Sequence, residues 1–249
     1  MAGTHPQVIM SVRRFYWLWG ILLFTFLAIG GFSWLAVVPL WQVHSAVGDS
    51  ELRVDDTKDG QQHRREECVR MLGGARRAAR RLESYIRLPR WIAGRRMPAI
   101  ALLTECGSPG VEVLGRLLEH SDCIVRKSAA NALRMLAPEI NEAIPMLTVA
   151  LSDSDPDVRE YVSHALALAG ARSRDAVPAL VLALQDSEGE VVVNAAWALG
   201  EVGASAQVAL PELTQLAADQ RADVRDAVAK ALKKIKKAVS VRPSTPRTP

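Results

Sequence analysis

Apolar and polar positions repeat every 33 residues through the second half of the chain. Valines, leucines and an Ala-Leu pair each return four times at this step: Val125, Val158, Val191 and Val224; Leu114, Leu147, Leu180 and Leu213; and the pairs that begin at Ala132, Ala165, Ala198 and Ala231. A fixed period over four copies is the signature of a repeat architecture. The pattern therefore predicts four stacked units over residues 110–237.

One copy, residues 143–176, indicates what each unit contains. Pro145 stands where the first turn of a helix tolerates proline, and Asp155 followed by Pro156 is typical of an N-cap and a second helix start. The second helix carries one apolar stripe, formed by Val158, Val162, Ala165, Leu166 and Ala169. Gly170 suits a left-handed residue at its end. Neither helix buries its stripe alone, so we predict an all-α fold, an α-solenoid of stacked two-helix units.

The shared motif, Pro-x-Leu…Leu-x-Asp…Asp-Val-Arg…Ala-Leu, resembles the short HEAT-like repeat that is also found in phycobilin lyase subunits. The resemblance covers roughly half of the chain and is clearest over residues 143–203. It weakens where Glu112 replaces the proline, His120 replaces the aspartate and Val192 replaces the arginine. The period is also shorter than the roughly 40–47 residues of ordinary HEAT repeats. The resemblance implies a scaffold fold that is used mostly for protein–protein contact.

The resemblance further implies that charged residues of the motif form ladders between neighbouring repeats. The matching positions are Asp153, Asp186, Asp219, Arg126, Arg159 and Arg225. We interpret these side chains as structural rather than as binding residues. Two enzymes share the repeat family, but the His-Glu pairs of the di-iron site of deoxyhypusine hydroxylase are absent. For phycobilin lyase subunits only the repeat can be matched, and no chromophore site.

Motifs of other catalytic chemistries are also absent from the sequence. There is no glycine-rich phosphate-binding motif and no Gly-x-Ser-x-Gly elbow. Residues 119–123 have the residue types of a metal site, but the repeat places them at the turn between two helices. Cys68, Cys106 and Cys123 have no metal-ligand spacing and indicate no disulfide framework. We therefore expect no catalytic residue, no cofactor and no metal.

Residues 15–41 contain no Asp, Glu, Lys or Arg, and tryptophans lie toward both ends. Because the stretch is long enough to cross a hydrocarbon core of roughly 30 Å, we interpret it as an uncleaved, single-pass transmembrane helix. A cleaved signal peptide and a buried core helix are the alternatives. Arg13 and Arg14 favour a cytoplasmic N-terminus, with the repeats on the non-cytoplasmic side, whereas the unpaired cysteines favour the opposite side.

The segments that flank the span and the repeats differ in charge and in expected order. We expect a short tail over 1–14, a flexible linker over 42–63 and a disordered tail over 238–249. Residues 64–104 form a basic helical segment, interpreted as a degenerate capping repeat. Its arginines suit contact with anionic lipid headgroups near the anchor, and a solvated face of the cap is the alternative. These arginines are Arg76, Arg77, Arg80 and Arg81.

We expect a protein partner to bind the inner face that the longer helices form. Side chains on the flank of the buried stripe form a ridge on this surface: Asn131, Tyr161, His164, Asn194, Trp197 and Lys230. Aromatic anchors among polar groups are typical of interaction hot spots. Trp197 has polar equivalents in the other copies, so it is either an exposed anchor or a contact between adjacent long helices.

The function that the sequence indicates is a membrane-anchored scaffold without catalysis. No nucleic-acid partner is expected, because the lysines near the C-terminus have no groove with interleaved aromatic residues. Two alternatives stay open. One is a phycobilin-lyase-like subunit or accessory factor that holds a substrate protein. The other is a regulatory subunit of a membrane complex that assembles through the span itself.

Overall fold

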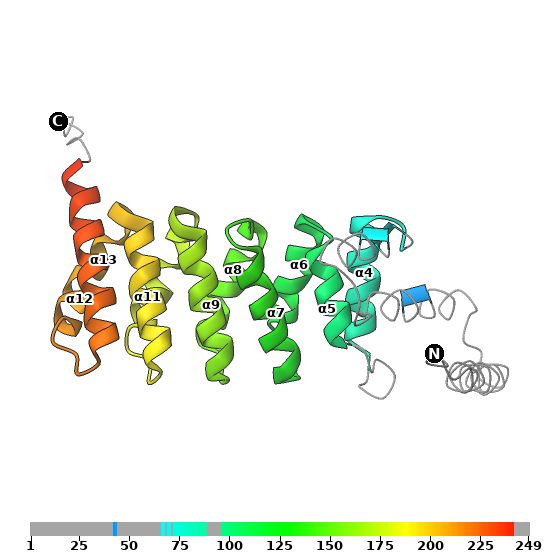
Figure 1. Ribbon diagram of the computed structural model, residues 1–249, viewed down its shortest axis with the longest axis horizontal. Helices are drawn as coiled ribbons and strands as arrows, with labels where there is room; N and C mark the ends of the chain where they lie inside the picture. Colours follow the sequence, from blue (N-terminus) through cyan, green and yellow to red (C-terminus); the bar gives the residue numbers. More distant parts are fainter. Residues whose placement is uncertain (1–41, 44–65, 68, 71, 89–95, 242–249) are drawn as a thin grey trace, which may run out of the picture. The chain divides into compact units, whose positions relative to one another are not determined.

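The described part of the chain is a row of helices (Figure 1). The computed structural model describes residues 42–43, 66–67, 69–70, 72–88 and 96–241, and all of these except Gln42 belong to one compact unit, 43–249. The helices of this unit whose bounds the structure describes are α4 (Ala75–Ile86), α5 (Arg96–Thr104), α6 (Ser108–Leu117), α7 (Cys123–Leu136), α8 (Ile144–Ala150), α9 (Pro156–Ala169), α10 (Val177–Ala183), α11 (Gly189–Val202), α12 (Leu210–Leu216) and α13 (Ala222–Val241). The 3-10 segments η1 (Asn141–Ala143), η2 (Gly170–Ala176) and η3 (Gly203–Ala209) precede α8, α10 and α12.

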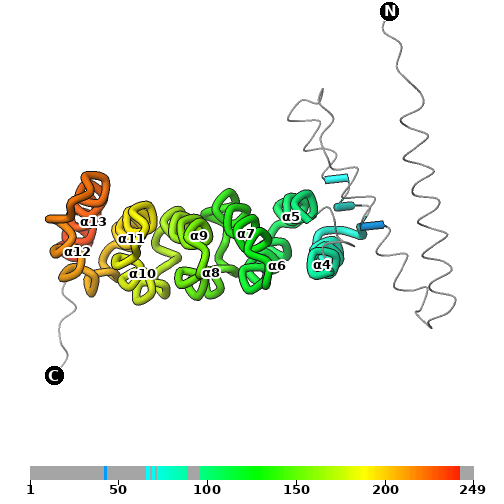
Figure 2. Tube along the Cα trace, turned by 90° about the horizontal axis from the view of Figure 1, so that it is seen from below, coloured from blue at the N-terminus to red at the C-terminus, as the bar shows by residue number. Residues whose placement is uncertain are grey.

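The helices lie in two layers, as Figure 2 shows. One layer contains α5, α7, α9, α11 and α13, and the other contains α4, α6, α8, α10 and α12. Each helix packs on the other helix of its pair, and successive helices of one layer pack on each other from α4 to α10 and from α5 to α13, whereas α10 and α12 each pack on η3. Such nearest-neighbour packing defines a solenoid. The prediction of an all-helical repeat solenoid is confirmed, and the residues that the structure describes contain no strand.

Local sequence signals set where the helices begin and end. Asp155 is the N-cap of α9, where its carboxylate accepts a hydrogen bond from the Asp157 N–H at 3.0 Å. Pro145 lies in the first turn of α8, as the sequence predicts. Gly170 and Gly203 end α9 and α11 with φ of 60° and 70°. Their ψ angles, −130° and −129°, differ from the left-handed helical conformation that we expected. The 3-10 segments η2 and η3 begin at these glycines.

The core lies between the two layers. The predicted stripe of α9 is buried throughout, with Ala169 the most exposed of its members at 5%. Leu166 and Leu199, which are equivalent in successive repeats, are both fully buried. The apolar period of the sequence therefore marks the side chains that hold the layers together.

Two segment boundaries can be compared with the described residues. The basic segment 64–104 contains α4 and α5, which pack on α6 and α7 as a further helix pair. At the other end, α13 continues to Val241, so residues 238–241 are helical rather than part of the expected tail. No helix-breaking residue occurs before Pro243, and Ala238 packs beside Gly203.

The expected anchor, residues 15–41, lies outside the described residues. Among the residues that the structure describes, no helix combines the length and the apolar character needed to cross a membrane.

Candidate protein-binding surface

An edge of the stack carries charged pairs between successive repeats. The Arg126 guanidinium donates two hydrogen bonds to the Asp153 carboxylate, at 2.8 and 3.0 Å. Arg159 donates in the same way to Asp186, at 2.7 and 2.9 Å. All four side chains are 15% exposed or less. Bidentate geometry with little exposure gives strong ion pairs. The Arg–Asp ladder implied by the resemblance thus forms at two of the repeat junctions.

The third rung is missing because Val192 occupies the position of the arginine. Asp219, the aspartate of the last repeat, instead accepts hydrogen bonds from Arg221 of its own repeat. Arg225 keeps only the bonds from its guanidinium to the carbonyls of Asp219 and Gln220. The ladder therefore ends where its sequence motif ends.

The ladder aspartates also shape the turn before each long helix. Asp153, Asp186 and Asp219 each accept a hydrogen bond from the backbone N–H two residues later. In the first full repeat His120 takes this role, since its Nδ1 accepts from the Asp122 N–H at 3.0 Å. Asp122 in turn caps α7 and pairs with Arg96. The residues suspected as a metal site are thus engaged in forming this turn.

The predicted binding residues lie on the layer that contains α7, α9, α11 and α13, the long helices of the four repeats. Asn131 is on α7, Tyr161 and His164 are on α9, Asn194 and Trp197 are on α11, and Lys230 is on α13. Lys230 is exposed, Asn194 is buried, and the other four are half-buried. Exposed Met135 of α7 and Leu168 of α9 lie on the same flank, one helical turn farther along.

Contacts between neighbouring long helices link most of these side chains into one row. The Arg134 guanidinium of α7 lies 5.7 Å from the Tyr161 ring centroid and donates hydrogen bonds to the Asn131 side chain. On the next pair, the His164 and Trp197 ring centroids are 5.4 Å apart, with a 55° angle between the planes. Burial, and then the charge of Arg134, lower the pKa of His164. The ring is therefore favoured in its neutral form, which suits packing against an indole.

The row continues from α11 to α13 through a carboxylate. Glu201 accepts a hydrogen bond from the Trp197 indole N–H at 2.8 Å and forms an ion pair with Lys234. Both interactions hold the pKa of Glu201 below its ordinary value, and the one with Lys234 contributes most. We call Asn131, Arg134, Tyr161, His164, Trp197 and Glu201 the aromatic row. Sequence reasoning missed Arg134, because its role depends on a distance between repeats.

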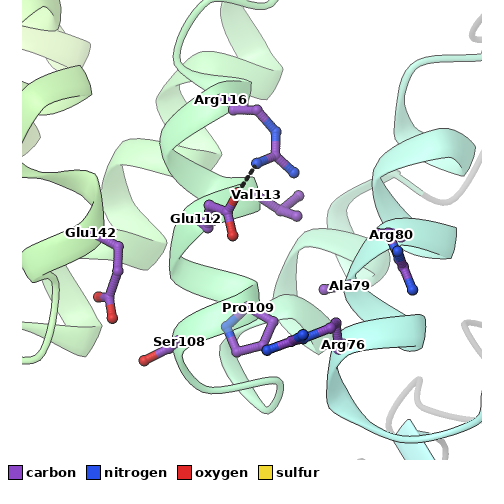
Figure 3. Close-up of a pocket in the computed structure, with 9 residues that line it drawn as sticks. All are labelled: Arg76, Ala79, Arg80, Ser108, Pro109, Glu112, Val113, Arg116 and Glu142. Carbon is purple, nitrogen blue, oxygen red and sulfur yellow. Dashed lines mark hydrogen bonds and ion pairs between the residues drawn. The ribbon is translucent and has the colours of Figure 1, made fainter.

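A hollow of about 540 Å³ lies between α4 and α6, in the layer that also contains α8, α10 and α12 (Figure 3). Its walls carry Arg76 and Arg80 from α4 and Glu112 and Arg116 from α6. Arg116 is already paired, with Glu112 and with Glu83 one period earlier. The walls therefore combine both signs of charge, and no ligand is indicated there.

The geometry and the comparisons with known proteins agree on one family. The HEAT repeat family matches residues 94–167 and 144–233, which together span more than half of the chain. The chain belongs to the HEAT-repeat family. No curated protein matches the sequence at a significant level.

Solved structures with a similar fold include engineered repeat proteins. An engineered protein is 23% identical with a TM-score of 0.54, and the match covers 79% of this chain and 97% of that one. A designed armadillo repeat protein, solved in complex with the peptide (KR)4, is 18% identical with a TM-score of 0.53, and the match covers 78% and 99%. The complex of CpcE and CpcF of phycocyanin lyase from Nostoc is 20% identical over 81% of each chain, with a TM-score of 0.41. At these identities the first two matches support the fold, and the third is too distant to support an argument.

Proposed function

We propose that this HEAT-repeat protein is a membrane-anchored scaffold that binds a protein partner on the face of its long helices. The observation that carries the proposal is the aromatic row, together with exposed Met135 and Leu168 beside it. Half-buried aromatic side chains are held in place by neighbours and still present surface to a partner. Such rigid anchors contribute most of the binding energy in protein interfaces.

The opposite layer offers a weaker candidate surface. It exposes Val149 on α8 and Leu182 on α10, at 69% and 71%. These are single aliphatic side chains without a neighbouring aromatic residue, and scattered exposed aliphatics are ordinary on protein surfaces. The designed armadillo repeat protein was solved in complex with a peptide, which illustrates that a repeat protein of similar fold can bind a peptide.

The test is affinity purification from detergent-solubilised membranes. We expect a specific protein to copurify with the wild-type chain and with Leu182→Ala, and to be lost with Tyr161→Ala or Trp197→Ala. Retention of the partner by both aromatic variants would show that the partner binds another surface of the protein. A partner that carries a bound tetrapyrrole would favour the lyase-like alternative.

The membrane part of the proposal rests on the uncharged stretch 15–41 and on the arginines of α4. Arg76, Arg77 and Arg80 are exposed, and no ion pair involves them among the described residues. Arg81 is half-buried. Free basic side chains near an anchor are each worth about 1 kcal/mol of attraction to an anionic membrane surface.

The lipid contact can be tested with a chain that starts at Glu51 and lacks the anchor. We expect it to sediment with vesicles that contain phosphatidylserine and to stay in solution with phosphatidylcholine vesicles. Replacing Arg76, Arg77 and Arg80 together by Gln should abolish sedimentation. Equal sedimentation of the triple variant would mean that these arginines form only a solvated face.

A further inference from the structure

A band of carboxylates lies beside the aromatic row, nearer to the N-terminal ends of the long helices. Asp157, Glu190 and Asp223 occupy equivalent positions of α9, α11 and α13, and Glu160 and Asp226 occupy a second equivalent pair. Asp157 precedes Tyr161 of the row by four residues, and Glu190 precedes Asn194 by four residues, so each carboxylate lies one helical turn before that side chain and on the same flank of its helix. We call these five side chains the acidic band.

Few ion pairs neutralise this band, although Arg134 of α7 acts on Glu160, Arg221 acts on Asp223, and α13 also carries the exposed Lys230. Asp157 pairs with Lys127 of α7. The other four carboxylates form no ion pair among the described residues, and Glu190, Asp223 and Asp226 are exposed. Burial, and then the charges of Glu190 and Asp157, raise the pKa of Glu160, with Arg134 opposing the rise. Glu160 is therefore a partly buried carboxylate near like charges of its own helix and of α11, and an added cation would favour its charged form.

Asn194 is a second and independent sign of a missing ligand. Its side chain is 7% exposed, and its amide makes no hydrogen bond within the described residues. It follows Glu190 by one helical turn and precedes Trp197 by another on α11. Its amide atoms are not fully enclosed. In the part of the chain that the structure describes, the fully enclosed side-chain atoms without a hydrogen-bond partner belong to Arg96 and Glu212. The amide thus lies at the edge of the surface without a protein partner, and a polypeptide backbone would supply both the donor and the acceptor that it lacks.

We propose that the partner presents an extended, basic segment that crosses α9 and α11 along the acidic band. This inference rests on the proposed function and names the chemistry of its partner. The backbone of the segment bonds with Asn194, its Lys or Arg side chains lie against Glu160 and Glu190, and their aliphatic stems pack on Tyr161 and Trp197. Neighbouring helices lie about 8–10 Å apart and an extended chain rises about 3.3 Å per residue, so basic residues should recur every second or third position.

The probe is a fluorescent octapeptide of alternating Lys and Arg, titrated with the full chain in detergent and followed by anisotropy. We expect saturable binding that weakens as salt is added, because exposed charges are screened. Glu160→Gln with Glu190→Gln should weaken binding about tenfold, since two charge-assisted contacts are lost. The matched control is Glu139→Gln with Asp175→Asn, two exposed carboxylates outside the long helices, and it should retain wild-type affinity.

Asn194→Leu separates a binding role from a structural one. The variant should be at least as stable as wild type in urea unfolding, because it removes an unpartnered amide, and it should bind the octapeptide more weakly. Equal losses of affinity in the Gln pair and in the control pair would overturn the proposal, as would an Asn194→Leu chain with unchanged affinity.

The inference can fail while the proposed function stands. If the partner purified from membranes is lost with Trp197→Ala but retained by the Glu160→Gln/Glu190→Gln variant, the face binds a protein of other chemistry. If both Tyr161→Ala and Trp197→Ala retain the partner, the proposed function itself fails.

Discussion

At the scale of the single residue, Trp197 is packed against its neighbours and is still partly exposed to solvent. Its ring contacts His164, and its indole N–H is bonded to Glu201, yet the side chain is half-buried. We expect Trp197→Ala to lower the free energy of unfolding by about 1–2 kcal/mol, less than the roughly 3–5 kcal/mol of a fully buried tryptophan. Urea unfolding measures the loss. Trp197→Phe keeps a ring beside His164 and should recover most of it, and a loss above about 3 kcal/mol for Trp197→Ala would assign the residue to the core.

Also at the scale of the residue, substitution of Arg159 tests how much the Arg–Asp ladder contributes to stability. Removing its guanidinium leaves the Asp186 carboxylate without its main partner, so Arg159→Met should cost about 2–3 kcal/mol at neutral pH. The hydrogen bonds from Arg159 lower the pKa of Asp186 in the folded chain. This stabilisation is therefore complete above the unfolded pKa and is lost as the pH falls through the folded value.

The difference in stability between wild type and Arg159→Met should consequently shrink as the pH falls below about 4. Urea unfolding at two pH values measures it. Arg225→Met is the matched control, because Arg225 occupies the same motif position without an aspartate partner, and its effect should be smaller and insensitive to acid. Equal effects of the two substitutions would show that the rung contributes nothing specific.

At the scale of the element, buried and exposed positions of the helices differ in the substitutions that they tolerate. Leu199 of α11 is fully buried, whereas Leu182 of α10 is 71% exposed. Leu199→Asp should unfold the stack at 25 °C, since an unpaired buried charge costs several kcal/mol. Leu182→Asp should change stability by about 0.5 kcal/mol or less. Circular dichroism during thermal unfolding compares the two, and similar melting temperatures would contradict the assigned repeat alignment.

At the scale of the whole molecule, the fold could be predicted because its period depends only on residue type. Val125, Val158, Val191 and Val224 are all fully buried, as an equal step of 33 requires. The pair of Asp219 with Arg221 and the contact of Arg134 with Tyr161 could not be predicted, because they depend on distances between helices. Helix α13 extends to Val241, past the expected start of the tail, because the residues after Lys237 include no helix breaker before Pro243.

Membrane attachment is the remaining prediction at this scale. If residues 15–41 span a bilayer, the full-length chain should stay with membranes during an alkaline wash, because burial of an apolar helix does not depend on charge. A chain that begins at Glu51 should be released by high salt at the latest, when contact between the basic segment and lipid is screened. Immunoblots of pellet and supernatant measure both. Release of full-length protein at alkaline pH would show that residues 15–41 do not anchor the chain in the membrane.

The equal spacing of the repeats has a consequence for how the gene can change. Because equivalent residues of successive copies are 33 positions apart, recombination between two copies removes or adds 33 codons and leaves the reading frame intact. The joined helices would meet the same neighbours as before, since each repeat contacts only the next. Evolution can therefore lengthen or shorten the long-helix face by whole repeats, without changing the residues of the core.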